Sequence, residues 1–137
     1  MQTILIAIDD QVISMLLSEE LFEEGYSIRT ISDPWMLGQA IQKSRLDLLI
    51  LDEFFGGGRG LDLCLELRKY LFETQVIIWA SWISVLGQVK KKLPANFHVF
   101  KTHTLQELTQ EICRRLRRPT EHRTQETPLA SECLLGH

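Results

Sequence analysis

The sequence has no long apolar run and no marked excess of charge of either sign. No run approaches the roughly 18 apolar residues that a membrane-spanning helix needs, and the first residues lack the basic and apolar regions of a signal peptide. The formal net charge of -3 produces no field that would recruit nucleic acid or anionic lipid to the whole surface. We therefore expect no contact with membranes and no direct contact with nucleic acid.

Cysteines are also few. The chain contains three of them, Cys64, Cys113 and Cys133. No two form a C-x-x-C pair, and their odd number argues against a disulfide framework. This usage favours a reduced, cytoplasmic setting.

The composition is that of a globular domain. Of the 137 residues, 45% are hydrophobic and 24% are charged, and this length fits one compact domain with a short appendage. From Pro119 onward the residues are polar and aperiodic. We therefore expect a domain over residues 1–118 and a flexible tail, or the start of a linker, over residues 119–137.

Short apolar runs alternate with helical patterns along the chain. Strands are predicted at residues 3–8, 26–31, 47–51, 76–79 and 98–100. Helices are predicted at about 12–24, from 34, at about 61–71, in a segment that ends near Leu93-Pro94, and from 105. Five strands alternating with five helices predict an α/β fold, a parallel sheet covered by helices on both faces.

Two of these helices begin with capping signals. Asp33 is expected to cap the second helix, with Pro34 in its first turn. Thr104 and Glu107 have the spacing of a capping box at the start of the last helix. The second helix is expected to bury Trp35, Met36, Ala40 and Ile41.

Polar residues follow four of the five predicted strands. The carboxyl ends of parallel strands meet at one edge of the sheet, where chemistry usually takes place. Crowded carboxylates cannot all ionise comfortably without a cation, and Mg²⁺ prefers oxygen ligands. With Mg²⁺ bound, one aspartate could attack a phosphoryl group, while a lysine and a serine hold its oxygens. The residues in question are Asp9, Asp10, Asp52, Ser81 and Lys101.

Each of these residues also has an ordinary structural interpretation. An aspartate after a strand is often a helix cap, and a serine there is often a turn former. A single lysine is usually a solvated surface charge. The combination is far less probable by chance, because separate strand ends must supply the right residue types in the right order.

At this point the sequence resembles the receiver domains of response regulators, including the single-domain chemotaxis regulator. The resemblance covers about residues 2 to 118 and depends on ILIAIDD, DLLILDEFFGGGRGLDLCLELR, VIIWAS and HVFK. Gly60, eight residues after Asp52, matches the family glycine before the third helix. The resemblance implies a flavodoxin-like, doubly wound, five-stranded parallel sheet of order 2-1-3-4-5 with five helices.

The resemblance also implies a role for each site residue. Asp10 would bind Mg²⁺ directly and Asp9 through water. Asp52 would be both metal ligand and phosphoacceptor, and the backbone carbonyl of Phe54 would be a further ligand.

The resemblance assigns the remaining two residues to the phosphoryl group. Ser81 would be the hydroxyl switch, and Lys101 would pair with a phosphoryl oxygen. A sensor histidine kinase or phosphotransfer protein would be the donor, so the chain is expected to be a signalling module rather than an enzyme. The signalling face would comprise the predicted helix before Leu93, the last strand and the last helix, and a homodimer could form through it.

The sequence departs from the family pattern at several positions. Thr102 stands where the family usually has a proline after a cis peptide, and the cost of a cis bond without proline, roughly 2.5–4 kcal/mol, favours a trans bond. Trp82 replaces a small residue and would narrow access to Asp52. His98 replaces the switch aromatic; it would respond to pH near neutrality or be a solvated strand-end histidine. Gly56 replaces a proline, which suggests a more mobile loop.

Apolar residues at two further positions predict a long-lived phosphorylated state. Phe54 and Ile83 occupy sites that, in fast-hydrolysing relatives, often carry polar groups that position the attacking water. Apolar side chains there should exclude that water.

Alternative functions remain open. A degenerate receiver could act as a phosphorylation-independent protein-interaction module. A small flavodoxin-like enzyme or nucleotide binder is a weaker alternative, because the chain has no G-x-G-x-x-G after the first strand and no Walker lysine. The basic residues Arg114, Arg115, Arg117 and Arg118 either interact with the dipole of the last helix or form an interaction surface.

Overall fold

A single parallel sheet forms the centre of the computed structural model, which describes residues 1–81, 84 and 93–116. Its five strands have the order β2-β1-β3-β6-β7, and every neighbouring pair is parallel. Numbered without the short hairpin strands β4 and β5, this is the predicted order 2-1-3-4-5, which is confirmed. The strands are β1 (Thr3–Ala7), β2 (Ser27–Ile31), β3 (Leu48–Asp52), β6 (Gln75–Ala80) and β7 (Phe97–Lys101).

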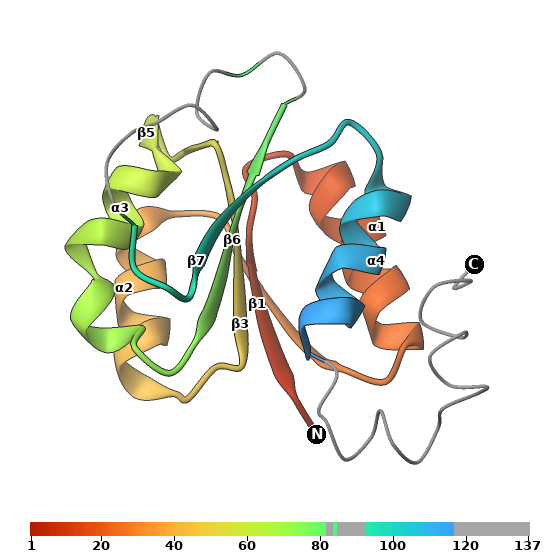
Figure 1. Cartoon of the computed structure of the whole chain (residues 1–137), viewed down its shortest axis with the longest axis horizontal. Coiled ribbons are helices and arrows are strands. Elements are labelled where there is room, and N and C mark those ends of the chain that lie inside the picture. Colours follow the sequence, from red (N-terminus) through yellow and green to blue (C-terminus); the bar gives the residue numbers. More distant parts are fainter. Residues whose placement is uncertain (82–83, 85–92, 117–137) are drawn as a thin grey trace.

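Helices cover both faces of the sheet (Figure 1). One face carries α1 (Gln11–Glu23) and α4 (Leu105–Leu116), and the other carries α2 (Pro34–Lys43), α3 (Gly60–Glu66) and a short 3₁₀ helix, η1 (Arg68–Tyr70). The predicted helix that ends near Leu93-Pro94 lies outside the described residues. Among the helices of the described part, none is long and apolar enough to cross a membrane.

The sheet separates two hydrophobic clusters, one under each helical layer. The strand β3 contributes to both, because successive side chains of a strand point to opposite faces. Leu48 and Ile50 belong to the cluster that includes residues of α1 and α4, whereas Leu49 and Leu51 belong to the one that includes residues of α2 and α3. All four are fully buried. Burial on both faces explains the continuous apolar run of this strand.

The predicted cap of α2 is present, but its predicted buried face is partly wrong. The Asp33 side chain accepts hydrogen bonds from the backbone N–H groups of Trp35 and Met36, at 2.8 and 3.2 Å. The Trp35 and Met36 side chains are nevertheless 69% and 44% exposed. The helix instead buries Leu37, Ala40 and Ile41. At helical spacing, Trp35 lies on the side opposite the stripe of Leu37, Ala40 and Ile41 that meets the sheet, and Met36 lies at the edge of that stripe.

The glycine-rich segment after β3 forms a β-hairpin that the sequence did not predict. Its strands are β4 (Phe54–Phe55) and β5 (Gly58–Arg59), which pair antiparallel. Gly56 and Gly57 have φ of +61° and +85°, and the two-residue type I′ turn requires positive φ at both positions. A Cβ on Gly56 would also lie 2.2 Å from the Pro34 Cγ. Glycine is therefore required where the hairpin meets the start of α2.

Two of the three cysteines, Cys64 and Cys113, lie among the described residues. Cys64 in α3 is a free and buried thiol, and burial raises its pKa to about 12. Cys133 lies outside the described residues.

Candidate functional site

The predicted site residues lie at one edge of the sheet. Four neighbouring parallel strands, β1, β3, β6 and β7, all end there. The register pairs Asp52 with Trp79 across β3 and β6, and Ala80 with Lys101 across β6 and β7. The backbone therefore brings to this edge the residues at and just beyond the strand ends, namely Asp9, Asp10, Asp52, Ser81 and Lys101.

Negative charge is crowded around Asp52. Burial raises the pKa of the half-buried Asp52 carboxyl. The Glu53 N–H donates a hydrogen bond to Asp52 Oδ1 at 2.9 Å, which lowers the pKa. The negative charges of Asp9, Glu53 and Asp10 raise the pKa further. The net pKa is raised. A carboxylate that is both desolvated and surrounded by like charges is stabilised by a bound cation.

Asp9 and Asp10 are each engaged in local hydrogen bonds. The Gly56 N–H donates to the Asp9 carboxylate, at 3.3 and 3.1 Å from its two oxygens. Asp10 Oδ1 caps α1 by accepting from the N–H groups of Val12 and Ile13, at 3.0 and 3.1 Å. The helix-cap interpretation is therefore correct for Asp10.

These acidic side chains do not form a preassembled metal cage. Among the described residues, no three His, Cys, Asp or Glu side chains are grouped closely enough to hold one metal ion. Mg²⁺ does not need such a cage, because it keeps several waters and commonly uses one or two carboxylates. The oxygen donors and the crowding of charge around Asp52 thus fit Mg²⁺.

Glu53 is a site residue that sequence reasoning missed. Its carboxylate accepts a hydrogen bond from the Ser81 N–H at 3.3 Å and another from the Ser84 hydroxyl. It therefore ties the end of β3 to the segment that follows β6. The available signal was its place directly after Asp52, at the carboxyl edge where neighbouring strand ends meet.

The peptide bond after Lys101 is trans, the form that the absence of proline favoured, since the described residues contain no cis peptide bond. The Thr102 N–H donates to the Ala80 carbonyl oxygen at 3.2 Å. Within the described residues, Lys101 forms no ion pair; both ion pairs found there involve Glu111. Trp82 and Ile83 lie outside the described residues.

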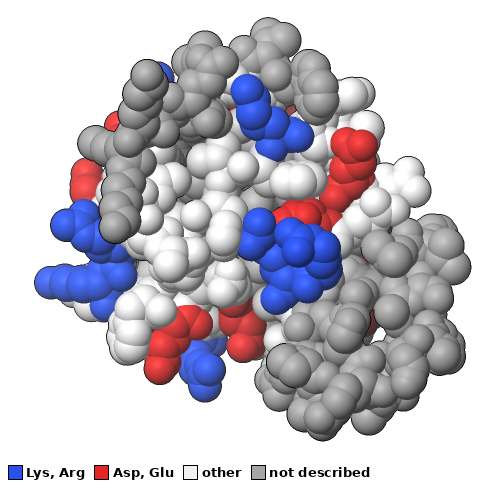
Figure 2. Space-filling view, viewed as in Figure 1, with Lys and Arg blue, Asp and Glu red and all other residues white. Residues whose placement is uncertain are grey.

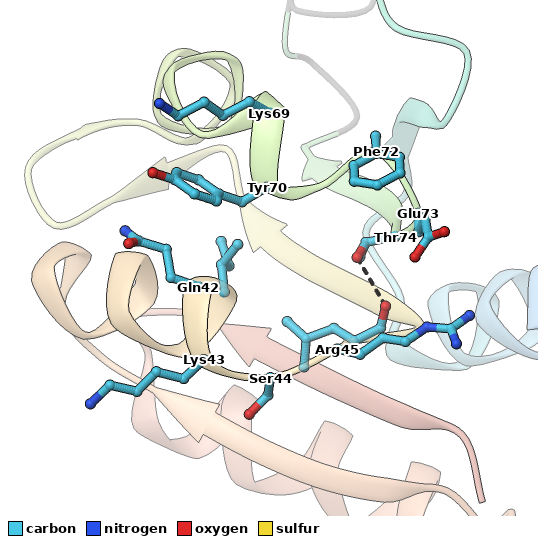
Figure 3. A pocket seen from close by; sticks show the side chains of 11 residues that line it. Gln42, Lys43, Ser44, Arg45, Lys69, Tyr70, Phe72, Glu73 and Thr74 are labelled. Carbon is cyan, nitrogen blue, oxygen red and sulfur yellow. Dashed lines mark hydrogen bonds between the residues drawn. The ribbon is translucent and has the colours of Figure 1, made fainter.

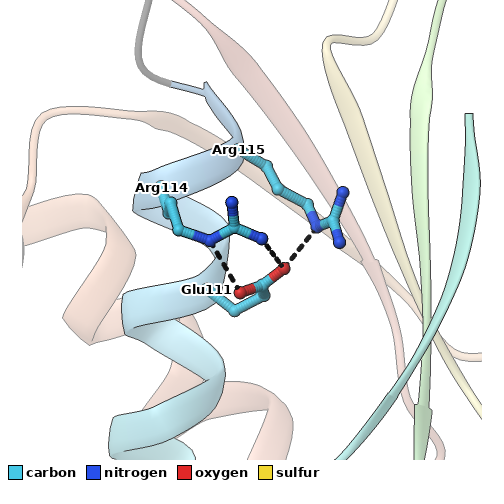
Figure 4. Close-up of polar contacts among 3 residues, drawn as sticks. All are labelled: Glu111, Arg114 and Arg115. Carbon is cyan, nitrogen blue, oxygen red and sulfur yellow. Dashed lines mark hydrogen bonds and ion pairs between the residues drawn. The ribbon is translucent and has the colours of Figure 1, made fainter. Parts of the chain in front are cut away.

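The basic end of α4 is organised around a carboxylate (Figure 4). Arg114 donates to both oxygens of Glu111, at 3.1 and 2.8 Å, and Arg115 Nε donates to the second oxygen. Figure 2 shows basic atoms gathered over α4 beside acidic ones. Arg117 and Arg118 lie outside the described residues.

His98 on β7 lies within electrostatic reach of this cluster. Burial lowers the pKa of His98, the charge of Arg115 lowers it further, that of Glu111 raises it and that of Arg114 lowers it. The net pKa is lowered, so His98 is neutral at pH 7.

A separate pocket of about 340 Å³ lies between the end of α2 and the segment from η1 to β6 (Figure 3). The Thr74 hydroxyl donates to the Leu46 carbonyl oxygen at 2.9 Å in its wall. Its lining includes Lys43, Arg45 and Lys69. None of the predicted site residues belongs to it, and β3 and β6 begin there rather than end.

Comparison with known proteins identifies the class to which this fold and site belong. A family model described as the response regulator receiver domain matches residues 4–113. The chain belongs to this family.

Sequence relatives include longer regulators. DNA-binding response regulator MtrA of Mycolicibacterium smegmatis is 30% identical over 117 residues, which are 85% of this chain and 51% of MtrA. DNA-binding transcriptional regulator NtrC of Azospirillum brasilense is 28% identical over 115 residues, 83% of this chain and 24% of NtrC. The chain thus spans between a quarter and a half of the length of these relatives.

Solved structures agree. Response regulator protein TrrA from Thermotoga maritima, in complex with Mg²⁺ and BeF, is 29% identical, with a TM-score of 0.67 over 85% of this chain and 100% of TrrA. TrrA in complex with the histidine kinase ThkA gives 27% identity and a TM-score of 0.68, over 85% of this chain and 99% of TrrA. A response regulator from Clostridium difficile, at 22% identity, gives a TM-score of 0.71 over 86% of this chain and 98% of that one. The flavodoxin-like receiver fold is confirmed.

Proposed function

We propose that this receiver domain takes a phosphoryl group onto Asp52 in a Mg²⁺-dependent reaction, from a sensor histidine kinase or phosphotransfer protein in the cytoplasm. The observation that carries the proposal is the raised pKa of Asp52, caused by burial and by the neighbouring acidic charges. Crowding of this kind at a sheet edge creates a demand for a divalent cation. The Mg²⁺-bound structure of TrrA and its complex with a histidine kinase support the same metal and partner.

In the proposed reaction, a carboxylate oxygen of Asp52 attacks the phosphorus of a phosphohistidine. The new P–O bond forms as the P–N bond breaks, and the electron pair of that bond stays on the imidazole nitrogen. The phosphohistidine ring is protonated on its other nitrogen, so it leaves as neutral imidazole. The Lys101 ammonium and the Ser81 hydroxyl would donate hydrogen bonds to the phosphoryl oxygens.

The proposed ligands of Mg²⁺ combine acidic side chains with a backbone oxygen. Asp10 and Asp52 would bind it directly, Asp9 through water, and Phe54 through its backbone carbonyl. When bound, Mg²⁺ neutralises charge on the carboxylates and the phosphoryl oxygens.

Phosphorylation would then change the signalling face, which comprises the predicted helix before Leu93, β7 and α4. A partner or a second copy of the chain would bind this face. We propose that this domain makes no direct contact with nucleic acid. MtrA and NtrC are named DNA-binding, but that name describes the whole proteins, and the chain matches only part of each. The proposed domain covers residues 1–118, with residues 119–137 as a tail or linker.

The test is incubation with Mg²⁺ and acetyl phosphate, followed by intact-mass measurement. We expect one acid-labile phosphoryl adduct on the wild type, dependent on Mg²⁺, and none on Asp52→Asn. Asp62→Asn, which changes an exposed aspartate on α3, is the matched control and should be modified like the wild type. An adduct that persists on Asp52→Asn would reject Asp52 as the acceptor.

The second candidate is a degenerate receiver that acts as a phosphorylation-independent interaction module. Two observations favour it. Lys101 forms no ion pair within the described residues. The Asp9 carboxylate, proposed above to bind Mg²⁺ through water, accepts a backbone hydrogen bond. A wild type that acquires no adduct and binds no beryllofluoride with Mg²⁺ would establish this alternative.

A further inference from the structure

Thr102, the residue that follows Lys101, is hydrogen-bonded through both its backbone and its side chain. Thr102 is only 2% exposed, and three residues separate the end of β7 from the start of α4. A connection this short leaves little conformational freedom to the backbone of the residue before it. Whatever fixes Thr102 therefore also fixes the backbone from which the Lys101 side chain departs.

Thr102 is bonded to β6 through both of its backbone groups. Its N–H donates to the Ala80 carbonyl oxygen at 3.2 Å. Its carbonyl oxygen accepts from the indole N–H of Trp79 at 3.0 Å. The two bonds reach consecutive residues of the neighbouring strand, so the backbone at Thr102 cannot rotate without breaking at least one of them.

The Thr102 hydroxyl makes two further hydrogen bonds, both with the start of α4. It donates to the Glu107 carboxylate and accepts from the Thr104 N–H at 3.2 Å. The Thr104 hydroxyl in turn accepts from the Glu107 N–H at 3.2 Å. In a capping box the Glu107 carboxylate would accept a hydrogen bond from the Thr104 N–H. Here the Thr102 hydroxyl lies between these two groups and bonds to both.

Trp79 connects this loop with the phosphoacceptor strand. It is paired in register with Asp52 on β3 and with Phe100 on β7. Its backbone carbonyl oxygen accepts from the Glu53 N–H at 3.1 Å. One residue is therefore bonded both to the position after Asp52 and to the position after Lys101.

We infer that Trp79 and Thr102 are positioning residues for Lys101. The indole N–H and the threonine hydroxyl hold a trans peptide in the one orientation that directs the Lys101 ammonium toward a phosphoryl group on Asp52. This inference rests on the proposed function. It assigns the roles to particular hydrogen bonds, so substitutions that remove the hydrogen-bonding group test it, and Thr102→Val does so without a change of shape.

The experiment is a double-mutant cycle with Lys101. Trp79→Phe removes the indole N–H and keeps an aromatic ring, Thr102→Val removes the hydroxyl and keeps the shape, and Thr102→Ser keeps the hydroxyl. Each is combined with Lys101→Met. The rate of phosphorylation by acetyl phosphate with Mg²⁺ is followed by intact mass, and urea unfolding and the rise in Tm with Mg²⁺ and beryllofluoride are measured in parallel.

With Lys101 present, Trp79→Phe and Thr102→Val should slow phosphorylation roughly five- to tenfold, the equivalent of about one lost hydrogen bond. They should also reduce the rise in Tm, and Thr102→Ser should behave like the wild type. In the Lys101→Met background, neither substitution should slow the reaction further.

Equal slowing in both backgrounds, or no slowing in either, would overturn the inference, since a merely structural role does not depend on Lys101. If Thr102→Val is unfolded in the urea measurement, Trp79→Phe decides alone. A wild type that acquires no adduct at all refutes the proposed function instead, and the positioning role falls with it.

Discussion

A Cβ atom on Gly60 would lie 2.1 Å from the backbone carbonyl oxygen of Asp52. No rotamer change can relieve this contact, because both atoms are held by the backbone. We therefore expect Gly60→Ala to lower the free energy of unfolding by about 3 kcal/mol, at the upper end of typical overpacking costs. Urea unfolding followed by circular dichroism measures it.

Gly58→Ala is the matched control for this substitution. A Cβ on Gly58 meets no atom within 4 Å, so the change in stability should stay within about 0.5 kcal/mol. Equal losses in the two variants would show that the close approach of Gly60 to Asp52 is not the cause.

Removing the charge of Asp52 should stabilise the metal-free protein. Asp52→Asn keeps the shape and relieves both the burial of a charge and the repulsion from Asp9, Glu53 and Asp10. A gain of about 1 kcal/mol corresponds to a rise in Tm of roughly 4 °C for a domain of this size. Differential scanning calorimetry with and without Mg²⁺ gives both values.

Mg²⁺ should stabilise the wild type more than Asp52→Asn, since the metal removes the repulsion that the mutant lacks. Glu73→Gln, at an exposed position that lines the pocket near η1, should keep the full response to Mg²⁺. The same metal response in Asp52→Asn and the wild type would count against a site at Asp52.

The phosphorylated state should decay slowly. Phe54 is 59% exposed and offers the attacking water no hydrogen bond. If a polar side chain orients that water with one hydrogen bond, Phe54→Asn combined with Ile83→Glu should speed the loss of phosphate roughly fivefold. The decay of the intact-mass adduct after removal of acetyl phosphate measures the rate, and an unchanged rate would refute the idea.

Stability should fall in acid partly through Glu111. Burial raises the pKa of Glu111, but the hydrogen bonds and charges of Arg114 and Arg115 outweigh it, so the net pKa lies below 4.5. A depressed carboxyl pKa contributes stability that is present above the unfolded value and is lost as the pH falls through the folded value. The difference in unfolding free energy between the wild type and Glu111→Gln should therefore shrink as the pH falls below about 4.5.

The two arginines that bind Glu111 should differ in importance. The Arg115 side chain is 20% exposed and that of Arg114 is 60% exposed. Arg115→Gln should cost about 1–2 kcal/mol of unfolding free energy at pH 7, and Arg114→Gln less than about 1 kcal/mol. The reverse order in urea unfolding would mean that exposure does not set the strength of these pairs.

His98 should titrate below its ordinary pKa of 6.5. The unfolded chain then binds the proton more readily, so His98 contributes stability that is present above pH 6.5 and is lost as the pH falls. In NMR titrations of the imidazole, Arg115→Gln should raise the His98 pKa and Glu111→Gln should lower it further. Shifts of the same sign in both variants would exclude charge as the cause.

The parallel sheet and the shared edge were predictable because they depend on patterns that the sequence carries directly, whereas the strand order came from the family resemblance. Buried parallel strands give continuous apolar runs such as that of β3. Alternation of strands with helices then fixes the parallel arrangement and gathers Asp9, Asp52 and Lys101 at one edge. The cap at Asp33 was equally readable, because it depends on local hydrogen bonds.

The features that were missed depend on contacts between segments. The exposure of Trp35 follows from how α2 lies on the sheet, which the helical spacing alone does not determine. The role of Glu53 depends on hydrogen bonds with Ser81 and Ser84, and that of Thr102 on a hydrogen bond with Trp79. These partners lie in other segments of the chain. The three glycines after Phe55 suggested a more mobile loop, and the hairpin became clear only from the pairing of β4 with β5 and the two positive φ values.

The Asp10 carboxylate has two roles, since it caps the first turn of α1 and is a proposed ligand of Mg²⁺. Any movement of this carboxylate toward a cation must be shared with the N–H groups of Val12 and Ile13. Loss of phosphorylation in Asp10→Ala would therefore have two causes that this variant does not separate, the loss of a metal ligand and the loss of the cap of α1. Asparagine caps a helix as well as aspartate does, so Asp10→Asn separates the two. The start of α1 is thus a place where metal occupancy could be read as amide hydrogen exchange.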